Sequence, residues 1–216
     1  MNQRKGMENF LAGGIYGITD DALSRGRSSM EVVRLLLAAG IRVIQYREKS
    51  KPDRAMYEEC RVIRDLTAGA GATFIVNDHV ALAMAVGADG VHIGQDDLPP
   101  VKVRELVGPD MVVGLSTHAR EQAGEAEKLA GVIDYIGVGP VFATGTKTDA
   151  AAPVGLALLE YVAANISLPY VAIGGVKEGN IAEVRRRGAG MIAIVSEIVG
   201  ADDIPAKVAA LRAAMA

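Results

Sequence analysis

The chain has 216 residues, of which 50% are hydrophobic and 23% charged, and its formal net charge is -3 at pH 7. This composition excludes a disordered or low-complexity protein. The slight negative charge and the aromatic content of only 4% argue against a nucleic-acid-binding protein. The single cysteine, Cys60, excludes a disulfide framework and a cysteine-rich metal site, and is typical of a reducing compartment, so we expect a cytoplasmic protein.

Eight short apolar runs recur along the chain, and each is predicted to be a β-strand. Their residues are mostly β-branched or aliphatic and nearly continuous, which is typical of parallel strands that are buried on both faces. In chain order the runs cover residues 14–19, 41–46, 73–76, 90–93, 111–115, 135–138, 170–173 and 191–195.

Helical patterns separate these runs. Apolar residues recur at intervals of three or four positions, as at Met56, Cys60 and Ile63, which predicts helices with one buried face. A glycine precedes several of the following strands, where it suits the left-handed backbone at the end of a helix. These glycines are Gly40, Gly71, Gly87, Gly108 and Gly188.

Eight strand-and-helix units in a chain of this length predict a single (β/α)₈ TIM barrel over residues 1–216, with residues 1–12 as an N-terminal extension. The alternative is a doubly wound open sheet, but the units show no shift in composition, which favours a closed barrel. No run approaches the roughly 18 apolar residues that are needed to cross a bilayer, so we expect no membrane partner. The longest irregular stretch, 139–153, predicts a functional loop.

Polar residues gather after the predicted strands, at the end of the barrel where active sites of this fold lie. His92 falls inside a run and is predicted to be a core or supporting residue. The other candidates are Gln45, Arg47 and Lys49 after the second run, Asn77 and Asp78 after the third, Asp96 and Asp97 after the fourth, Ser116 and His118 after the fifth, and Thr144, Thr146 and Lys147 after the sixth.

The last two runs end in Gly174-Gly175 and in Val195-Ser196. Loops at these places in TIM barrels often bind phosphate through backbone N–H groups. Glycine allows the backbone to approach the anion, and Ser196 adds a hydroxyl donor, so we predict a phosphate site. The alternative is a tight turn followed by a serine that caps a helix.

Asp78 and Asp97 follow neighbouring strands and are predicted to hold Mg²⁺, which usually binds one or two carboxylates together with water and substrate phosphate. The alternative is that each aspartate caps the helix after it. Asp96 competes with Asp97 for this role, and the spacing does not separate them.

Arg47, Lys49 and Lys147 add three positive charges to the same rim of an acidic protein. Cations beside a metal suit a substrate that carries two phosphates. The alternative is that these are solvated surface charges, with Arg47 and Lys49 sharing Glu48 as their partner.

Six of these motifs occur together in the order found in one family. They are the segments 45–49 (Gln-Tyr-Arg-Glu-Lys), 77–78 (Asn-Asp), 87–99, 114–118, 139–147 and 172–176. The chain resembles the thiamine phosphate synthase family along nearly its whole length, from residue 16 to residue 196. The resemblance implies a (β/α)₈ barrel and a transferase that joins hydroxymethylpyrimidine diphosphate to a thiazole phosphate, which is carboxylated or not, and releases pyrophosphate.

The resemblance also implies a role for each candidate residue. Asp78 and Asp97 would hold Mg²⁺, the one cofactor expected, and two small phosphorylated heterocycles would be the partners. A homo-oligomer is one option for the assembly. The pyrimidine diphosphate would contact Gln45, Arg47, Lys49, Asn77, Ser116 and Lys147, of which Arg47, Lys49, Ser116 and Lys147 would be catalytic. The thiazole phosphate would contact Thr144, Thr146, Gly175, Val195 and Ser196.

Two other functions compete with this interpretation. A thiazole tautomerase on the same barrel would need the phosphate site and His118 but no diphosphate or Mg²⁺ site. Asp78, Asp97 and the Thr-x-Thr-Lys run at 144–147 favour the synthase. The other competitor is a barrel that binds a phosphorylated ligand without catalysis.

Overall fold

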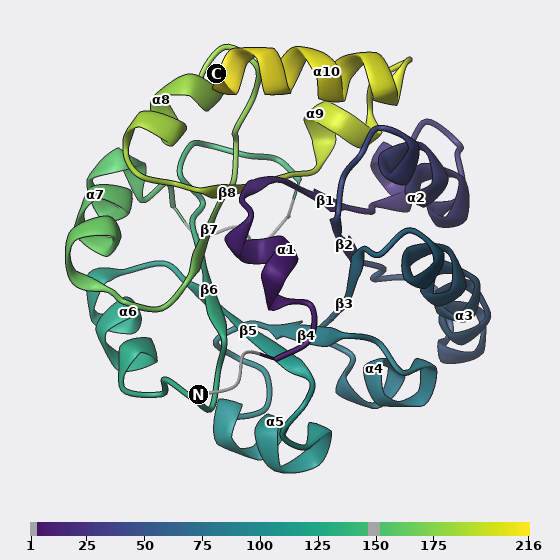
Figure 1. The fold of residues 1–216 in the computed structure, drawn as a ribbon, viewed down its shortest axis with the longest axis horizontal. Helices are drawn as coiled ribbons and strands as arrows, with labels where there is room; N and C mark the ends of the chain where they lie inside the picture. Colours follow the sequence, from purple (N-terminus) through teal and green to yellow (C-terminus); the bar gives the residue numbers. More distant parts are fainter. Residues whose placement is uncertain (1–3, 147–151) are drawn as a thin grey trace.

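The computed structural model describes residues 4–146 and 152–216, and these residues form a closed barrel of eight parallel strands (Figure 1). Each strand pairs with its neighbours in chain order, and β8 closes the ring by pairing with β1, for example at Gly17 and Ile194. This confirms the TIM barrel and excludes the open sheet. The strands are β1 (Gly14–Ile18), β2 (Val43–Tyr46), β3 (Thr73–Asn77), β4 (Gly90–Ile93), β5 (Val112–Thr117), β6 (Tyr135–Val138), β7 (Tyr170–Ile173) and β8 (Met191–Ile194).

The predicted runs and the strands agree to within two residues at each end. β2 begins at Val43 rather than at residue 41, because the Ile41 N–H donates to Leu36 O and so still belongs to the end of the preceding helix. β5 continues to Thr117, because Ser116 and Thr117 pair with Gly137 and Val138 of β6.

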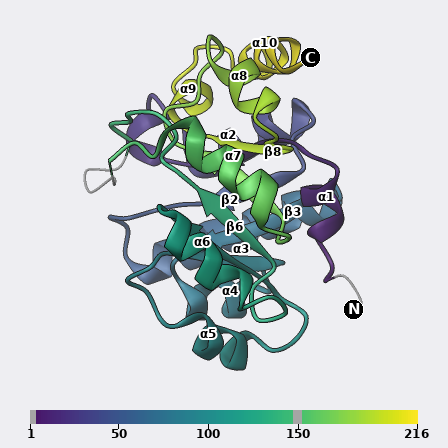
Figure 2. The ribbon, with the colours of Figure 1, turned by 90° about the vertical axis from the view of Figure 1, so that its left-hand side faces the viewer.

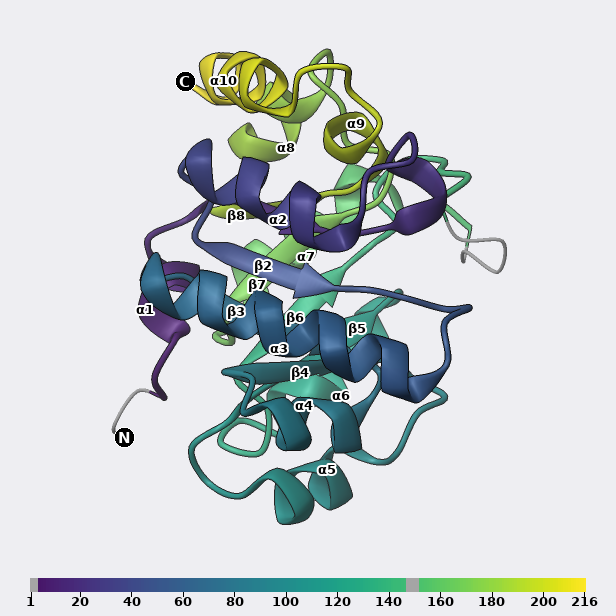
Figure 3. The same cartoon turned by 90° about the vertical axis from the view of Figure 1, so that its right-hand side faces the viewer.

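Helices form the outer layer of the barrel (Figures 2 and 3). The five glycines predicted to end helices all have positive φ, which a residue with a side chain rarely adopts. The 3₁₀ turn η1 (Asp21–Leu23) follows β1. The α-helices after β1 are α2 (Ser29–Ala38), α3 (Asp53–Gly69), α4 (Val80–Val86), α5 (Pro100–Val107), α6 (Arg120–Glu127), α7 (Gly155–Asn165), α8 (Ile181–Arg186), α9 (Ser196–Val199) and α10 (Ile204–Met215).

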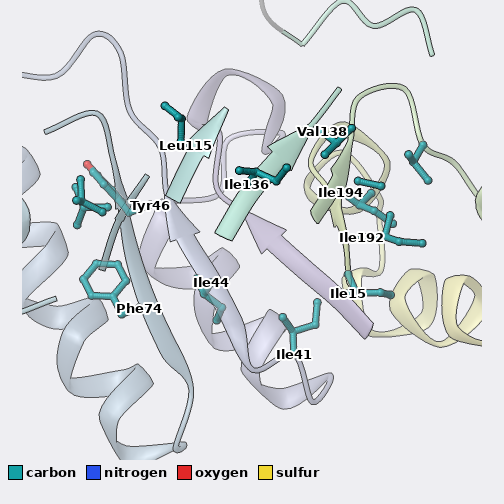
Figure 4. Close-up of a cluster of buried hydrophobic side chains, with 14 of the residues drawn as sticks. Ile15, Ile41, Ile44, Tyr46, Phe74, Leu115, Ile136, Val138, Ile192 and Ile194 are labelled. Carbon is teal, nitrogen blue, oxygen red and sulfur yellow. The ribbon is translucent and has the colours of Figure 1, made fainter. Parts of the chain in front are cut away.

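The strands bury both of their faces. Side chains such as Ile44, Phe74 and Ile136 point outward and pack between the strands and the helices (Figure 4). The alternate side chains point into the barrel, as strand geometry requires. They form a separate apolar cluster that includes Tyr16, Ile18, Val43, Ile75, Val112, Tyr135, Val171, Met191 and Ala193.

Helix α1 (Met7–Leu11) crosses the end of the barrel at which the strands begin (Figures 1 and 3). Met7 and Phe10 are buried in the inner cluster, and the Phe10 ring centroid lies 5.6 Å from that of Tyr16 and 4.4 Å from that of Tyr135. Arg4 bonds to Asp134 and holds the start of this segment on the barrel. The bottom of the barrel is therefore closed, and the opposite end is left for a site. No helix in the described part of the chain is long and apolar enough to span a membrane.

Candidate active site

A cavity of about 520 Å³ lies at the end of the barrel where the strands end. Its position follows from the inward positions of the strands, which change from apolar to polar toward this end. Val43 is followed by Gln45 on β2, and Ile75 by Asn77 on β3. The volume lies within the range of about 300–1,000 Å³ that is usual for small-molecule sites.

Arg47 lies on the cavity wall in a buried ion pair. One guanidinium nitrogen is 2.5 Å from Asp20 Oδ2, and the Arg47 backbone N–H donates to Thr19 Oγ1 at 3.0 Å. The Arg47 Nε is buried without a hydrogen-bond partner among the described residues. An unsatisfied charged donor is costly to bury, so this nitrogen has an unmet need for an acceptor.

Asp78 and Asp97 both line the cavity, and each makes a contact that orients it. Asp78 has φ 61°, and its Oδ2 lies 2.5 Å from Lys49 Nζ. Asp97 Oδ2 accepts from the Gly94 N–H at 2.7 Å, whereas α5 begins after Pro99. The helix-cap alternative is therefore wrong for Asp97.

Glu48 lies outside the cavity, and Arg47 and Lys49 do not share it, because their ion pairs are with Asp20 and Asp78. The predicted sharing of Glu48 is therefore wrong. Its Oε1 accepts from the backbone N–H groups of Lys49 and Ser50 and from the Ser50 hydroxyl. Burial by itself raises the pKa of Glu48, but the hydrogen bonds of Ser50 and Lys49 and the charge of Lys51 outweigh it and lower the pKa. Glu48 thus anchors the loop from which Arg47 and Lys49 project.

Five side chains form a continuous hydrogen-bonded row across the floor of the cavity. Gln45 Nε2 donates to the Tyr16 hydroxyl at 2.8 Å, and the hydroxyls of Tyr16 and Tyr135 are 3.3 Å apart. The Tyr135 hydroxyl is 3.0 Å from His92 Nδ1, and His92 Nε2 is 2.9 Å from Ser116 Oγ. The row joins the two predicted ligand contacts Gln45 and Ser116.

The opposite wall is built from the loops after β6, β7 and β8. Gly174 and Gly175 have positive φ, and a Cβ on Gly175 would lie 2.6 Å from Ala143 O. Only glycine fits this tight turn, which is the turn that the alternative interpretation of these glycines predicted; phosphate binding here stays a prediction. α9 begins at Ser196, with Val195 as its N-cap residue, so the interpretation of Ser196 as a capping residue is wrong. The predicted residues at this wall are Thr144, Thr146, Gly175, Val195 and Ser196, and all of them line the cavity.

Comparison with known proteins assigns the chain to a family. The family model described as thiamine monophosphate synthase matches residues 15–198. The chain belongs to the thiamine monophosphate synthase family. It is 62% identical to a thiamine-phosphate synthase of Pelotomaculum thermopropionicum, over 99% of this chain and 97% of that one.

Two further relatives agree. A thiamine-phosphate synthase of Lawsonia intracellularis is 53% identical over 93% of this chain and 92% of its own. The solved structure of a thiamine phosphate pyrophosphorylase from Pyrococcus furiosus matches with a TM-score of 0.86 and 37% identity, and 97% of each chain is covered. These matches extend over the whole barrel, including every strand end that contributes to the cavity.

The donor set of the cavity suits Mg²⁺ better than a metal held by protein ligands alone. No group of three or more His, Cys, Asp or Glu side chains that could hold a metal occurs in the parts of the chain that the structure describes. Mg²⁺ needs less, because it keeps several waters and is commonly held by one or two carboxylates together with substrate phosphates. Asp78 and Asp97 supply two carboxylates beside a cavity large enough for such a substrate.

All but one of the predicted site residues line this single cavity. Lys147 lies outside the described residues, so the structure does not place it. Asp96 lines the cavity together with Asp97. The residues that the cavity brings together are Gln45, Arg47, Lys49, Asn77, Asp78, Asp97, Ser116, Thr144, Thr146, Gly175, Val195 and Ser196.

Several residues of the site were missed from the sequence, among them Tyr16, Tyr135 and Asp20. Tyr16 and Tyr135 sit within apolar strands, where a tyrosine is usually a core residue, and Asp20 follows the first strand without a motif of its own. Period-two alternation gives a signal for Tyr16, because it places this residue on the same face as Ile18 at the cavity. His92, predicted to be a supporting residue, contacts Ser116 directly.

Proposed function

We propose that the chain is a thiamine-phosphate synthase, a transferase that joins hydroxymethylpyrimidine diphosphate to thiazole phosphate or its carboxylated form. The products are thiamine phosphate and pyrophosphate, and the carboxylated substrate also releases its carboxyl group as CO₂. The main support is that residues from six strand ends, each in a motif of the family, converge on one cavity, in a chain 62% identical to a thiamine-phosphate synthase.

The diphosphate is proposed to bind at the side of the cavity that carries Arg47 and Lys49, with Lys147 as a third cation. Arg47 is already oriented by Asp20, and its buried Nε needs an acceptor. Cations held in place before the reaction stabilise the charge that develops on a leaving group, because they need little reorganisation. When bound, Mg²⁺ would be held by Asp78 and Asp97 and would add positive charge beside the diphosphate oxygens.

The transfer is proposed to be dissociative. The bond between the pyrimidine methylene carbon and the diphosphate oxygen breaks, and its electron pair leaves with pyrophosphate. The amino group of the pyrimidine delocalises the positive charge that remains on carbon. The thiazole nitrogen then donates its lone pair to this carbon and forms the new C–N bond. Gln45, Asn77 and Ser116 hold the pyrimidine during this step and transfer no proton.

The thiazole phosphate is proposed to bind at the opposite wall. Gly175 allows close approach of the backbone, and Thr144, Thr146 and Ser196 supply hydroxyl donors at the cavity. Binding through the remote phosphate orients the ring nitrogen toward the pyrimidine. Holding two reactants together in this way contributes up to about 7–11 kcal/mol to lowering a barrier in ideal cases.

The deciding experiment mixes the purified protein with both phosphorylated substrates, with and without Mg²⁺, and follows pyrophosphate. Release that needs both substrates and Mg²⁺ is the expected result. Isomerisation of the carboxylated thiazole phosphate without pyrophosphate release would instead identify a thiazole tautomerase. Binding of one ligand without any turnover would identify a non-catalytic protein.

A further inference from the structure

We infer that the hydrogen-bonded row from Gln45 to Ser116 is polarised in one direction, so that His92 is a positioning residue that holds the Ser116 hydroxyl as a donor toward the ligand. The row consists of Gln45, Tyr16, Tyr135, His92 and Ser116 and is called the floor row below.

The direction follows from the orientation of the Gln45 amide and from counting hydrogens. The Tyr16 oxygen accepts from Gln45 Nε2, and the single Tyr16 hydrogen is directed to the Tyr135 oxygen, because a buried O–H without an acceptor is costly. The opposite direction would require the Gln45 amide to be turned over, with its oxygen accepting from Tyr16. By the same reasoning, the Tyr135 hydrogen is donated to His92 Nδ1. With Nδ1 as the acceptor, the imidazole hydrogen of His92 is on Nε2 and is donated to Ser116 Oγ.

The surroundings pack closely around the two tyrosines at the centre of the floor row. Tyr16 and Tyr135 are almost completely buried, and the Phe10 ring of α1 packs against both. A Cβ on Gly114 would lie 2.2 Å from Tyr135 Cζ and 2.5 Å from His92 Nδ1, so only glycine leaves room for their contact. Burial raises the pKa of both tyrosines, which keeps both phenols protonated as donors.

The polarity has a consequence for the ligand, which rests on the function proposed above. Gln45 donates one of its two amide N–H groups to Tyr16, which fixes the amide and leaves its carbonyl oxygen as an acceptor, while Ser116 retains its O–H as a donor. An aminopyrimidine presents the complementary groups, namely N–H donors on the amine and acceptors at the ring nitrogens. A 4-oxo analogue presents an acceptor to the Gln45 oxygen. We therefore expect the floor row to select the amine over the oxo form by roughly 10- to 100-fold in affinity.

The first test measures the His92 tautomer by ¹⁵N NMR of the full-length protein labelled on histidine, with His92→Gln to assign the signals. The expected result is a protonated Nε2 and an unprotonated Nδ1. A protonated Nδ1 would reverse the direction of the row and overturn the inference, whatever reaction the protein catalyses.

The second test uses Tyr135→Phe, which removes the central hydroxyl and keeps the ring. We expect the His92 tautomer to become mixed, the selectivity for hydroxymethylpyrimidine over its 4-oxo analogue in calorimetry to fall about tenfold, and KM for the pyrimidine diphosphate to rise while KM for the thiazole phosphate does not. Tyr46→Phe is the matched control, because the Tyr46 hydroxyl is also buried but donates to Glu59 away from the cavity. Equal effects of the two variants would overturn the inference.

These results separate the two proposals. The expected tautomer in a protein that releases no pyrophosphate would support the floor row and reject the synthase. Pyrophosphate release with the opposite tautomer would support the synthase and reject the floor row.

Discussion

Arg47 and Asp20 lie 27 residues apart in the chain and form an ion pair of 2.5 Å at the cavity wall. The Arg47 side chain is only 12% exposed and the Asp20 side chain 8%. Because water has little access to the ion pair, the carboxylate holds the guanidinium in place. Asp20 Oδ1 also accepts from the Leu23 N–H at 3.2 Å and caps the η1 turn after β1. One aspartate therefore ties a cation of the proposed diphosphate site to a neighbouring strand end.

We expect Asp20→Asn to lower kcat/KM for pyrophosphate release by roughly 10–100-fold, because the guanidinium loses its charged partner and is no longer held in position. Asparagine can still accept from the Leu23 N–H, so η1 should remain folded. Steady-state kinetics check the prediction, and a thermal melt verifies folding. Asp21→Asn, a change in the adjacent residue outside the cavity, serves as the control. An unchanged kcat/KM in a folded Asp20→Asn variant would contradict the positioning role.

Asp78→Asn is expected to raise the Mg²⁺ concentration needed for half-maximal activity by at least about tenfold, since one charged oxygen ligand is lost. Asparagine, unlike alanine, tolerates the left-handed backbone of this residue, so little folding stability should be lost.

Lys147→Ala should lower turnover far more than it alters folding.

The same Mg²⁺ titration separates Asp96 from Asp97, the two candidate metal ligands in the loop after β4. Asp97→Asn should raise the Mg²⁺ requirement as Asp78→Asn does, whereas Asp96→Asn should leave it nearly unchanged. The opposite order would transfer the ligand role to Asp96. Loss of activity in proportion to the unfolded fraction alone would remove both residues from the metal site.

The strands and the strand-end residues could be predicted because both depend on local information. A buried parallel strand needs a short run of β-branched residues, and barrel topology then brings every strand end to one rim. Gln45, Asn77 and Ser116 reached the same cavity for this reason.

Pairings across the barrel could not be predicted in this way. The contact between Tyr16 and Tyr135 joins residues 119 positions apart and exists only because β1 and β6 face each other inside the closed barrel. Asp20 was missed for a similar reason, since its partnership with Arg47 depends on the packing of the loops that follow β1 and β2. A single sequence contains the residue types of such pairs but not their distances.

The lowered pKa of Glu48 predicts how one part of the stability depends on pH. A carboxylate whose pKa is lower in the folded than in the unfolded protein stabilises the fold above the unfolded value of 4.5, and this contribution is lost as the pH falls through the folded value. Glu48→Gln should therefore lower the free energy of unfolding at about pH 7, and the difference from the parent should shrink below about pH 4.5. Urea denaturation over this range measures it. Glu58→Gln, at an exposed helix position, is the control, and a difference that stays constant with pH would reject the linkage.

Phe10 and Leu11 test whether α1 packs on the barrel core at the end where the strands begin. Phe10 is 5% exposed and packs on Tyr16 and Tyr135, whereas the neighbouring Leu11 is 59% exposed. Phe10→Ala should lower the free energy of unfolding by about 3–5 kcal/mol, the usual cost of truncating a buried phenylalanine. Leu11→Ala should change it by less than about 0.5 kcal/mol, because little burial is lost. Chemical denaturation of both variants measures these losses. A loss for Phe10→Ala as small as the one expected for Leu11→Ala would mean that α1 contributes little to the core, and that other residues shield the tyrosines of the floor row.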